Sequence, residues 1–381
     1  MGILRTNTLS GIGTDGPIFD GVTKFDTQGY VVPPVGITSN RTLVGVTTAQ
    51  GAIRFNTDSQ KLEFYAQDQW WEMVIDTPAL AVGSNSEAGA RGVFGGGMDT
   101  APSSEVNIID YINISSTGNA TDFGDLTLAR DFTSATSSAT RGIWFGGVNP
   151  GVIGLNNIDY VTISSTGNAI DFGAAQSVAQ RNHGAVSNGS RGIYAGTSGN
   201  IIEYVTIAST GNRQDFGDLY YISTGGGSVN SPTRGVFCGG SDGPAPVAEH
   251  NVIQYITMST LGNSTDFGDL TSIRGFPAGV CNSTRGVIGG GRTPTALSTI
   301  DYITIASLGN AISFGTLTQA RNASGGCSSP TRGVFGGGYA PGTVNTIDYI
   351  IITTQGNAVD FGDLTVARRG LAGLSNAHGG L

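Results

Sequence analysis

Six copies of one sequence unit occupy most of the chain, and this repeat limits the fold more than any other feature. Each copy begins with a segment such as RGVFGGG and continues with a segment such as IDYITI, a Gly-Asn pair and, in five copies, Asp-Phe-Gly; the remaining copy has Ser313 in place of the aspartate. The copies start 50, 50, 43, 51 and 47 residues apart. A period of this length indicates an array of similar structural units. The arginines that begin the copies are Arg91, Arg141, Arg191, Arg234, Arg285 and Arg332.

Each copy contains four candidate strands. The first is a stretch of small residues such as FTSATSSAT from Phe132, and the second is the RGVFGGG segment. The IDYITI segment alternates large apolar and polar residues, which is typical of a half-buried strand. The fourth contains DFGDL, and turns such as STGNA join it to the third, because Gly and Asn tolerate the positive φ of tight hairpins. The unit is therefore predicted to be an antiparallel four-stranded meander.

The composition agrees with an all-β chain, since 61 glycines and 13 prolines in 381 residues exclude a mainly helical protein. Six four-stranded meanders at this period match a β-propeller, which closes into a ring and leaves only short protected edges. A solenoid is the alternative, but its repeats are usually shorter and its two ends need caps. The sequence thus predicts a six-bladed propeller of four-stranded blades in residues 78–381, preceded by a small β-rich module in residues 1–77.

Several motifs resemble those of known families. The order of an arginine, a small strand, an apolar strand ending in Gly-Gly and a strand with a tyrosine resembles the kelch blade over about residues 79–381. The segments TRGVFGGG, NTIDYITIAS and GNAVDFGDLTVARR are similar to repeats in virion structural proteins of marine tailed bacteriophages, especially cyanophages. Residues 51–74 are similar to a hairpin module of phage tail fibres and appendages, and residues 1–25 resemble their attachment leaders. In place of the usual kelch tryptophan the repeats have Phe123, Phe172, Phe216, Phe267, Phe314 and Phe361.

The resemblance implies a non-enzymatic structural protein of a virion, with no cofactor and no catalytic residue. Residues 1–77 are expected to dock to other virion proteins at the tail, baseplate or neck, and the propeller to be displayed for assembly contacts or for attachment to a host glycan or protein. The chain is expected to form a homo-oligomer, with a trimer as the family pattern. Two alternatives stay open: a glycan-binding, lectin-like propeller, and a kelch-type propeller enzyme, which needs a metal site or an acid pair in one blade.

The charge pattern excludes some partners. The net charge is −9, and Lys24 and Lys61 are the only lysines, so the chain lacks the basic surface that nucleic acid requires. No stretch approaches 18 consecutive apolar residues, and the first residues do not form a signal peptide, so we expect neither membrane insertion nor secretion.

The repeated arginines are the most conspicuous site candidates. The six that begin the copies either form a ring of charge that binds an anion or stabilise each blade, and we favour the structural role. In that role they bind strand-end carbonyls or pair with a repeated acid. These acids are Asp110, Asp159, Glu203, Asp301 and Asp348. A second series is absent from the third unit, where Ile222 and Ser223 stand nearby; it comprises Arg130, Arg181, Arg274, Arg321 and Arg368.

The aspartates of Asp-Phe-Gly follow a turn and are predicted to cap backbone amides there. A calcium site is the alternative, although the acids lack the clustering that calcium needs. These aspartates are Asp122, Asp171, Asp215, Asp266 and Asp360.

Rare residue types give few further candidates. His183, His250 and His378 fall at non-equivalent positions, so the sequence predicts no metal centre. The cysteines are too few for a disulfide framework and are predicted to be small buried residues. They are Cys238, Cys281 and Cys327.

The tryptophans are predicted to have different roles. Trp144 occupies a second-strand position and is expected in the core, with a stacking platform for a sugar as the alternative. Because adjacent strand residues face opposite ways, one of Trp70 and Trp71 should be buried and the other available to a neighbouring subunit or partner. Residues 1–45 are expected to be held by other chains.

The count of strands raises the question of how the ring closes. Two segments, residues 80–90 and 370–381, compete for the first strand of the first unit. Aligning Ser375 with Ser137 makes residues 370–381 the better match. The C-terminal segment is therefore predicted to pair with the strand that starts at Arg91, with residues 79–90 serving as a linker.

Overall fold

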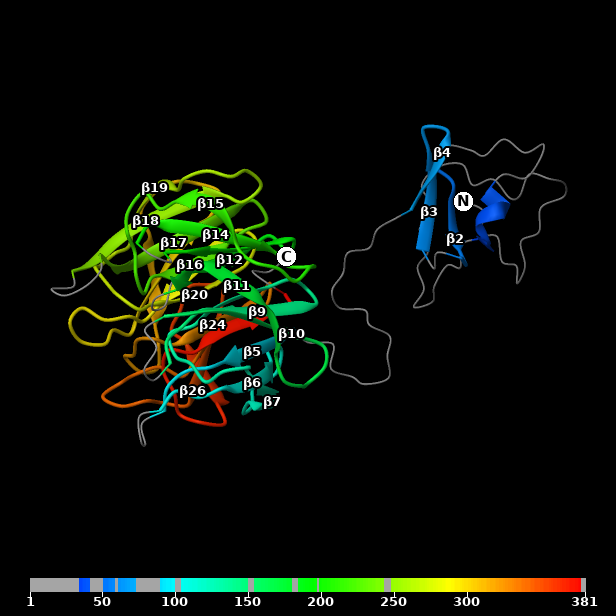
Figure 1. The fold of residues 1–381 in the computed structure, drawn as a ribbon. Coiled ribbons are helices and arrows are strands. Elements are labelled where there is room, and N and C mark those ends of the chain that lie inside the picture. Colours follow the sequence, from blue (N-terminus) through cyan, green and yellow to red (C-terminus); the bar gives the residue numbers. More distant parts are fainter. Residues whose placement is uncertain are drawn as a thin grey trace, which may run out of the picture. The chain divides into compact units, whose positions relative to one another are not determined.

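The computed structural model describes residues 34–41, 51–58, 61–72, 90–99, 104–149, 154–179, 184–196, 199–242 and 248–377. The chain divides into two compact units, residues 1–77 and 78–381. The described residues form seven four-stranded sheets and one short 3₁₀ helix, which confirms the all-β prediction (Figure 1). No helix in these ranges is both long and apolar enough to cross a membrane.

The sheet of the N-terminal unit is a meander with one added parallel strand. Strand β1 pairs in parallel with β2, and β2, β3 and β4 follow one another as antiparallel neighbours. Gln67 and Asp68 both have positive φ, as a two-residue hairpin turn between β3 and β4 requires. The elements are β1 (Val35–Gly36), η1 (Thr38–Arg41), β2 (Ile53–Asn56), β3 (Lys61–Ala66) and β4 (Gln69–Glu72).

The second unit contains six sheets, which we call repeat sheets 1 to 6 in the order of their RGVFGGG-type strands. In each, four strands pair as antiparallel neighbours, which confirms the predicted meander. The innermost strands are β28 (Ala372–Ser375), β8 (Ser134–Ser137), β12 (Ala185–Ser187), β16 (Gly227–Asn230), β20 (Ala278–Cys281) and β24 (Gly325–Ser328). The second strands are β5 (Arg91–Gly95), β9 (Arg141–Phe145), β13 (Arg191–Ala195), β17 (Arg234–Ser241), β21 (Arg285–Gly289) and β25 (Arg332–Gly336).

The outer two strands of each repeat sheet carry the tyrosine and phenylalanine segments. The third strands are β6 (Ile108–Asn113), β10 (Leu155–Thr162), β14 (Ile201–Thr206), β18 (Glu249–Thr257), β22 (Thr299–Thr304) and β26 (Thr346–Ile351). The fourth strands are β7 (Thr121–Asp125), β11 (Ile170–Ala179), β15 (Gln214–Asp218), β19 (Thr265–Asp269), β23 (Ile312–Thr316) and β27 (Val359–Asp363).

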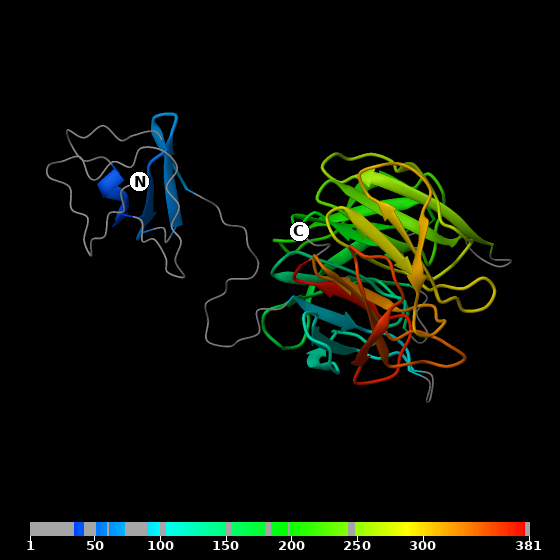
Figure 2. The same ribbon diagram turned by 180° about the vertical axis from the view of Figure 1, so that it is seen from behind.

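Repeat sheet 1 is built from both ends of the unit. The C-terminal strand β28, red in Figures 1 and 2, pairs with β5 so that Leu374 lies opposite Val93 and Ser375 opposite Gly92. The Arg91 N–H donates to the Asn376 side-chain oxygen, and the Asn376 N–H donates to the Arg91 carbonyl. The predicted pairing of the C-terminal segment is thus confirmed, whereas residues 79–89 and Gly379 lie outside the described residues.

The repeat sheets follow one another in cyclic order. The innermost strands contact their neighbours in the sequence β8, β12, β16, β20, β24, β28 and back to β8. Among the described residues, each of six buried apolar clusters joins two consecutive sheets, and one of them contains Phe94 of sheet 1 together with Val334 and Ile347 of sheet 6. The core therefore lies between the sheets rather than in a single centre.

Candidate functional site

The six arginines that begin the repeats connect each sheet to the next. Each donates from Nη1 to a carbonyl oxygen just beyond the third strand of the following sheet, at 2.8–3.1 Å. The last bond, from Arg332, returns to Ile114 of sheet 1. The prediction that these arginines bind strand-end carbonyls is confirmed. The pairs are Arg91 with Ile163, Arg141 with Ile207, Arg191 with Met258, Arg234 with Ile305, Arg285 with Ile352 and Arg332 with Ile114.

The same guanidinium groups stack on aromatic rings of their own sheets. Each lies 4.5–4.8 Å from the centroid of the tyrosine on the third strand. That tyrosine in turn packs edge-on against the phenylalanine of the Asp-Phe-Gly segment or its Ser-Phe-Gly equivalent, with centroids 5.9–6.1 Å apart. The cation–π attraction is stronger when the cation is partly desolvated. Each guanidinium therefore binds a carbonyl and a ring, and it is not presented to an anion. The tyrosines are Tyr111, Tyr160, Tyr204, Tyr255, Tyr302 and Tyr349.

The second series of arginines pairs with the repeated acids. In four sheets an arginine that precedes the innermost strand lies 2.6–3.0 Å from an aspartate of the third strand, and both side chains are fully buried. A threonine completes each site by donating its N–H and its hydroxyl to the same carboxylate, as Thr271 does to Asp301. Burial lowers the pKa of these arginines, and the neighbouring carboxylate opposes that shift. The pairs are Arg130 with Asp159, Arg274 with Asp301, Arg321 with Asp348 and Arg368 with Asp110.

Sheets 3 and 4 depart from this pattern. In sheet 3 the buried arginine is Arg213, which lies 3.1 Å from Glu203 and comes from the turn between β14 and β15. Arg181, the predicted member of the series, lies outside the described residues. Sequence reasoning missed Arg213, although it stands at the Gly-Asn-x position where the other copies have Ala or Ser.

In sheet 4 a neutral network replaces the ion pair. Gln254 stands at the position of the aspartate, and its side-chain oxygen accepts from the Ser264 hydroxyl at 2.8 Å and from the Tyr221 N–H at 3.1 Å. Ser223 stands at the position of the arginine and donates to the Gly239 carbonyl at 2.6 Å. The buried polar atoms of Gln254 and Ser223 thus have hydrogen-bond partners, and none of these groups is charged.

No backbone amide of the described turns donates to the aspartates of Asp-Phe-Gly, so the prediction that they cap these amides was wrong. The side-chain oxygen of the asparagine in each Gly-Asn pair accepts from a backbone N–H of the preceding sheet's fourth strand at 3.0–3.2 Å. The aspartates Asp122, Asp171, Asp215, Asp266 and Asp360 are exposed. A Cβ on Gly124 of β7 would collide with the Gly167 carbonyl, so glycine is needed where the fourth strand meets the turn of the next sheet.

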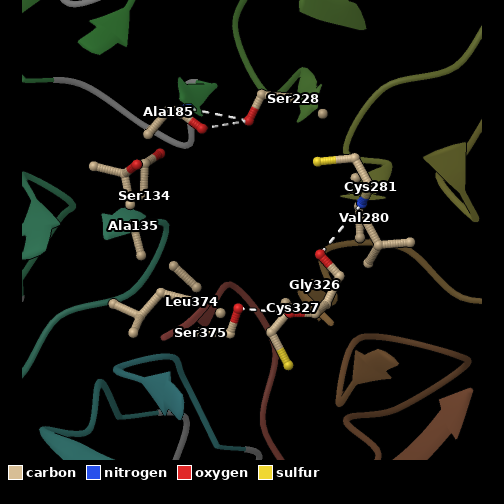
Figure 3. A pocket seen from close by; sticks show the side chains of 18 of the residues that line it. Ser134, Ala135, Ala185, Ser228, Val280, Cys281, Gly326, Cys327, Leu374 and Ser375 are labelled. Carbon is tan, nitrogen blue, oxygen red and sulfur yellow. Dashed lines mark hydrogen bonds between the residues drawn. The ribbon is translucent and has the colours of Figure 1, made fainter. Parts of the chain in front are cut away.

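A cavity of about 130 Å³ lies at the centre of the repeat sheets. It is lined by the innermost strands, and small side chains such as Ser134, Ser228, Cys327 and Ser375 surround it (Figure 3). None of the described residues that line it is charged. The space suits a few water molecules or one small neutral polar molecule rather than an ion.

Polar side chains at one position of the innermost strands form hydrogen bonds between neighbouring strands. Ser375 donates to the Ser328 carbonyl and Ser137 to the Ser375 carbonyl, each at 2.6 Å. Ser187 donates to the Ser137 carbonyl and Asn230 to the Ser187 carbonyl, each at 2.8 Å. These four bonds run from sheets 1, 2, 3 and 4 to the preceding sheet, opposite in sense to the arginine bonds, and they occupy carbonyls at the inner sheet edges.

The other rare residues of the repeat region are mostly structural. Trp144 is fully buried at the position of Phe94 and Phe335, so its predicted place in the core is confirmed. The three cysteines are free and buried, as predicted. Burial raises the pKa of the Cys281 thiol to about 11 and raises that of Cys238 as well.

His250 is buried at a position that is apolar in other sheets. The residue is only 7% exposed, and its ring lies close to the Ile222 backbone. Its carbonyl accepts from the Arg274 N–H, the contact that Leu297 makes with Arg321. Its ring packs edge-on against Tyr221 with centroids 4.7 Å apart. Burial lowers the pKa of His250 from 6.5, although the nearby Asp242 and a hydrogen bond to the Ile222 backbone oppose the shift.

We expect His250→Leu to make the protein less sensitive to acid. Because the folded-state pKa lies below the unfolded value of 6.5, the unfolded chain binds more protons as the pH falls through 6.5. The contribution of His250 is therefore present at neutral pH and is lost on acidification. The urea midpoint of the wild type should fall more steeply than that of His250→Leu between pH ~7 and ~5. Parallel pH profiles for the two proteins would contradict this prediction.

The described residues contain no group of three or more His, Cys, Asp and Glu side chains that could hold a metal ion, and His183 and His378 lie outside the described ranges. No protein-family model matches the chain, and no curated protein matches it either.

Proposed function

We propose that residues 78–381 are a six-bladed, kelch-like β-propeller and that the chain is a non-enzymatic structural protein of a phage virion. The observation that carries the propeller is the cyclic order of the repeat sheets, in which sheet 6 contacts sheet 1. An open solenoid would leave its first and last units without such a contact. The C-terminal strand β28, which completes sheet 1, supports the same closure.

A structural role is supported by how the repeated charged groups are used. The arginines of the first series bind backbone carbonyls and tyrosine rings, and those of the second series are buried against acids. These guanidinium groups are thus engaged in contacts within and between the repeat sheets. A rigid platform of this kind is suited to display outward-facing loops.

In this proposal residues 1–77 dock to other virion proteins at the tail, baseplate or neck, and the propeller contacts the host or other virion components. The test is the composition of particles purified from an infected host culture. Mass spectrometry should find the chain in these particles at a fixed ratio to the major tail proteins. Recovery of the chain only from the soluble fraction of lysed cells would overturn the proposal.

Glycan binding is a second candidate, favoured by one local feature. Tyr220 stands where four other repeats have threonine, and it is 67% exposed next to Tyr221 and Ile222. Exposed aromatic rings stack on the apolar faces of sugars. Tyr220→Ala should then reduce binding to host-surface glycans, whereas Leu308→Ala, at another exposed apolar residue in sheet 5, should not. Equal binding by both variants would exclude this surface.

A further inference from the structure

Two phenylalanines from opposite repeat sheets pack against each other. Phe132 precedes β8 of sheet 2, and Phe276 precedes β20 of sheet 5. These sheets are three places apart in the cyclic order in either direction. The ring centroids nevertheless lie only 5.7 Å apart, with the ring planes inclined at 51°. The two rings therefore meet across the axis around which the repeat sheets are arranged.

The pair lies at one end of the central cavity. Phe132 and Phe276 each come directly before a residue that lines the cavity, and so do the equivalent residues of sheets 4, 6 and 1. The sixth equivalent residue, Asn182 of sheet 3, lies outside the described residues. The phenylalanine rings thus cover the cavity at the end where the innermost strands begin. The lining residues that follow this layer are Thr133, Gly226, Pro277, Ser324 and Leu371.

The backbone conformation at this position is unfavourable for a large side chain. All five described residues have positive φ, with values of 50° for Phe132, 67° for Gly225, 57° for Phe276, 56° for Ala323 and 66° for Gly370. Glycine adopts such a conformation freely, whereas bulky residues rarely do. Strained residues of this kind cluster at functional sites. Sheets 2 and 5 therefore have a ring at the axis in spite of the strain, where sheets 4 and 1 have glycine.

The neighbouring glycines leave room for the rings, and the backbone beneath them is fixed. A Cβ on Gly225 would lie 2.6 Å from the Phe276 ring, and one on Gly370 would lie 3.5 Å from the Phe132 ring. The Phe276 N–H donates to the Gly225 carbonyl at 2.6 Å, and the Ala323 N–H donates to the Phe276 carbonyl at 2.9 Å. The rings themselves have no polar atoms, so only packing and cation–π contacts hold them. They can separate by rotation of their side chains while the backbone stays in place.

We propose that Phe132 and Phe276 form a gate that controls the entry of small uncharged molecules into the central cavity. Both residues are half-buried, so the gate is accessible from outside. None of the described residues that line the cavity is charged, and burial of an unpaired ion costs far more than burial of a neutral polar group. The cavity therefore favours uncharged molecules once the rings have separated.

The test uses Cys281 as a reporter in the full chain. Cys281 lines the cavity, whereas Cys238 of β17 does not. The double variant Phe132→Gly/Phe276→Gly removes both rings and introduces the residue that sheets 4 and 1 already have. Iodoacetamide, which is small and uncharged, should alkylate Cys281 at least about tenfold faster in this variant than in the wild type at pH ~8, because thiol reactivity depends on access. Mass spectrometry of the peptides gives the rate at each cysteine.

Three controls accompany this measurement. Ala323→Gly changes the equivalent residue of sheet 6 without removing a ring, so the Cys281 rate should stay at the wild-type value. Iodoacetate, the charged analogue of similar size, should gain less than iodoacetamide from loss of the rings. The single variants Phe132→Gly and Phe276→Gly should give intermediate rates, and they serve as the test if the double variant does not fold.

Four results would overturn the gate. An unchanged Cys281 rate in the ring-deleted variants would show that the rings do not control access. A parallel increase at Cys238 would indicate general loosening of the sheets. A wild-type Cys281 rate equal to that of a free thiol would show that the cavity is already open. An equal gain for iodoacetate would contradict the preference for uncharged molecules.

Discussion

Deleting residues 369–381 is expected to abolish the single cooperative unfolding transition of the repeat region. The deletion removes β28 and with it the buried Leu371 and Leu374. Loss of one buried leucine side chain typically costs about 2–5 kcal/mol, and a domain of this kind is stable by only about 5–15 kcal/mol. The deletion also exposes the edge of β5, which can then pair with other chains. We expect aggregation, or an early partial transition in calorimetry.

The control for this experiment removes residues 378–381 alone, which follow β28 in sequence. That variant should unfold like the wild type. If the longer deletion also gave one transition at the parental temperature, β28 would not be required for closure. The N-terminal segment before Arg91 would then be the better candidate for the closing strand.

Asp301→Asn is expected to destabilise the protein by about 3–5 kcal/mol, because it leaves the Arg274 guanidinium buried without a compensating charge. Both side chains are fully buried, and their Nη2 and Oδ2 atoms lie 2.6 Å apart. The change is nearly isosteric, so a cavity contributes little to the loss. The urea midpoint gives the free energy of unfolding if the slope stays unchanged.

Sheet 4 supplies the matched control for this prediction. Combining Arg274→Ser, Asp301→Gln and Ala311→Ser installs in sheet 5 the residue types that sheet 4 has at Ser223, Gln254 and Ser264. The combined variant should be more stable than Asp301→Asn, because no buried charge is left unpaired. A combined variant as unstable as the single one would show that sheet 5 needs the ion pair itself.

The sequence predicted the four-stranded units and the C-terminal pairing because both depend on local patterns. Alternation in segments such as IDYITI sets which side chains face the neighbouring sheet, and the alignment of Ser375 with Ser137 identified the closing strand. It was harder to predict which arginine series pairs with the repeated acids. For the first arginine series the sequence left strand-end carbonyls and the repeated acids as alternative partners. Only the structure shows that Arg91 binds a carbonyl of the next sheet and that the acid Asp159 pairs with Arg130.

Other errors come from contacts between copies and from single substitutions. The aspartates of Asp-Phe-Gly follow a turn in sequence, but they are exposed, and the cap that the structure contains is made between sheets, where Asn168 accepts from the Asp125 N–H at the end of β7. Arg213 is an isolated change in one copy, and its length lets it reach Glu203 from within the same sheet. An alignment of the repeats shows the residues that the copies share, but it does not show which contact a substitution in one copy forms.

The contact between Arg91 and Asn376 makes the break in the repeat region equivalent to the turns between the first two strands of the five other repeat sheets. In the other repeat sheets a continuous turn joins the first two strands, and the same two bonds form within it, as between Ser138 and Arg141. In sheet 1 these bonds form between residues 285 positions apart. A circular permutant that is opened at any of these five turns, with Asn376 joined to Arg91 by a turn, is therefore expected to keep the two bonds that hold the first two strands of each sheet together. The fold itself therefore does not determine at which of these six equivalent positions the repeat region begins.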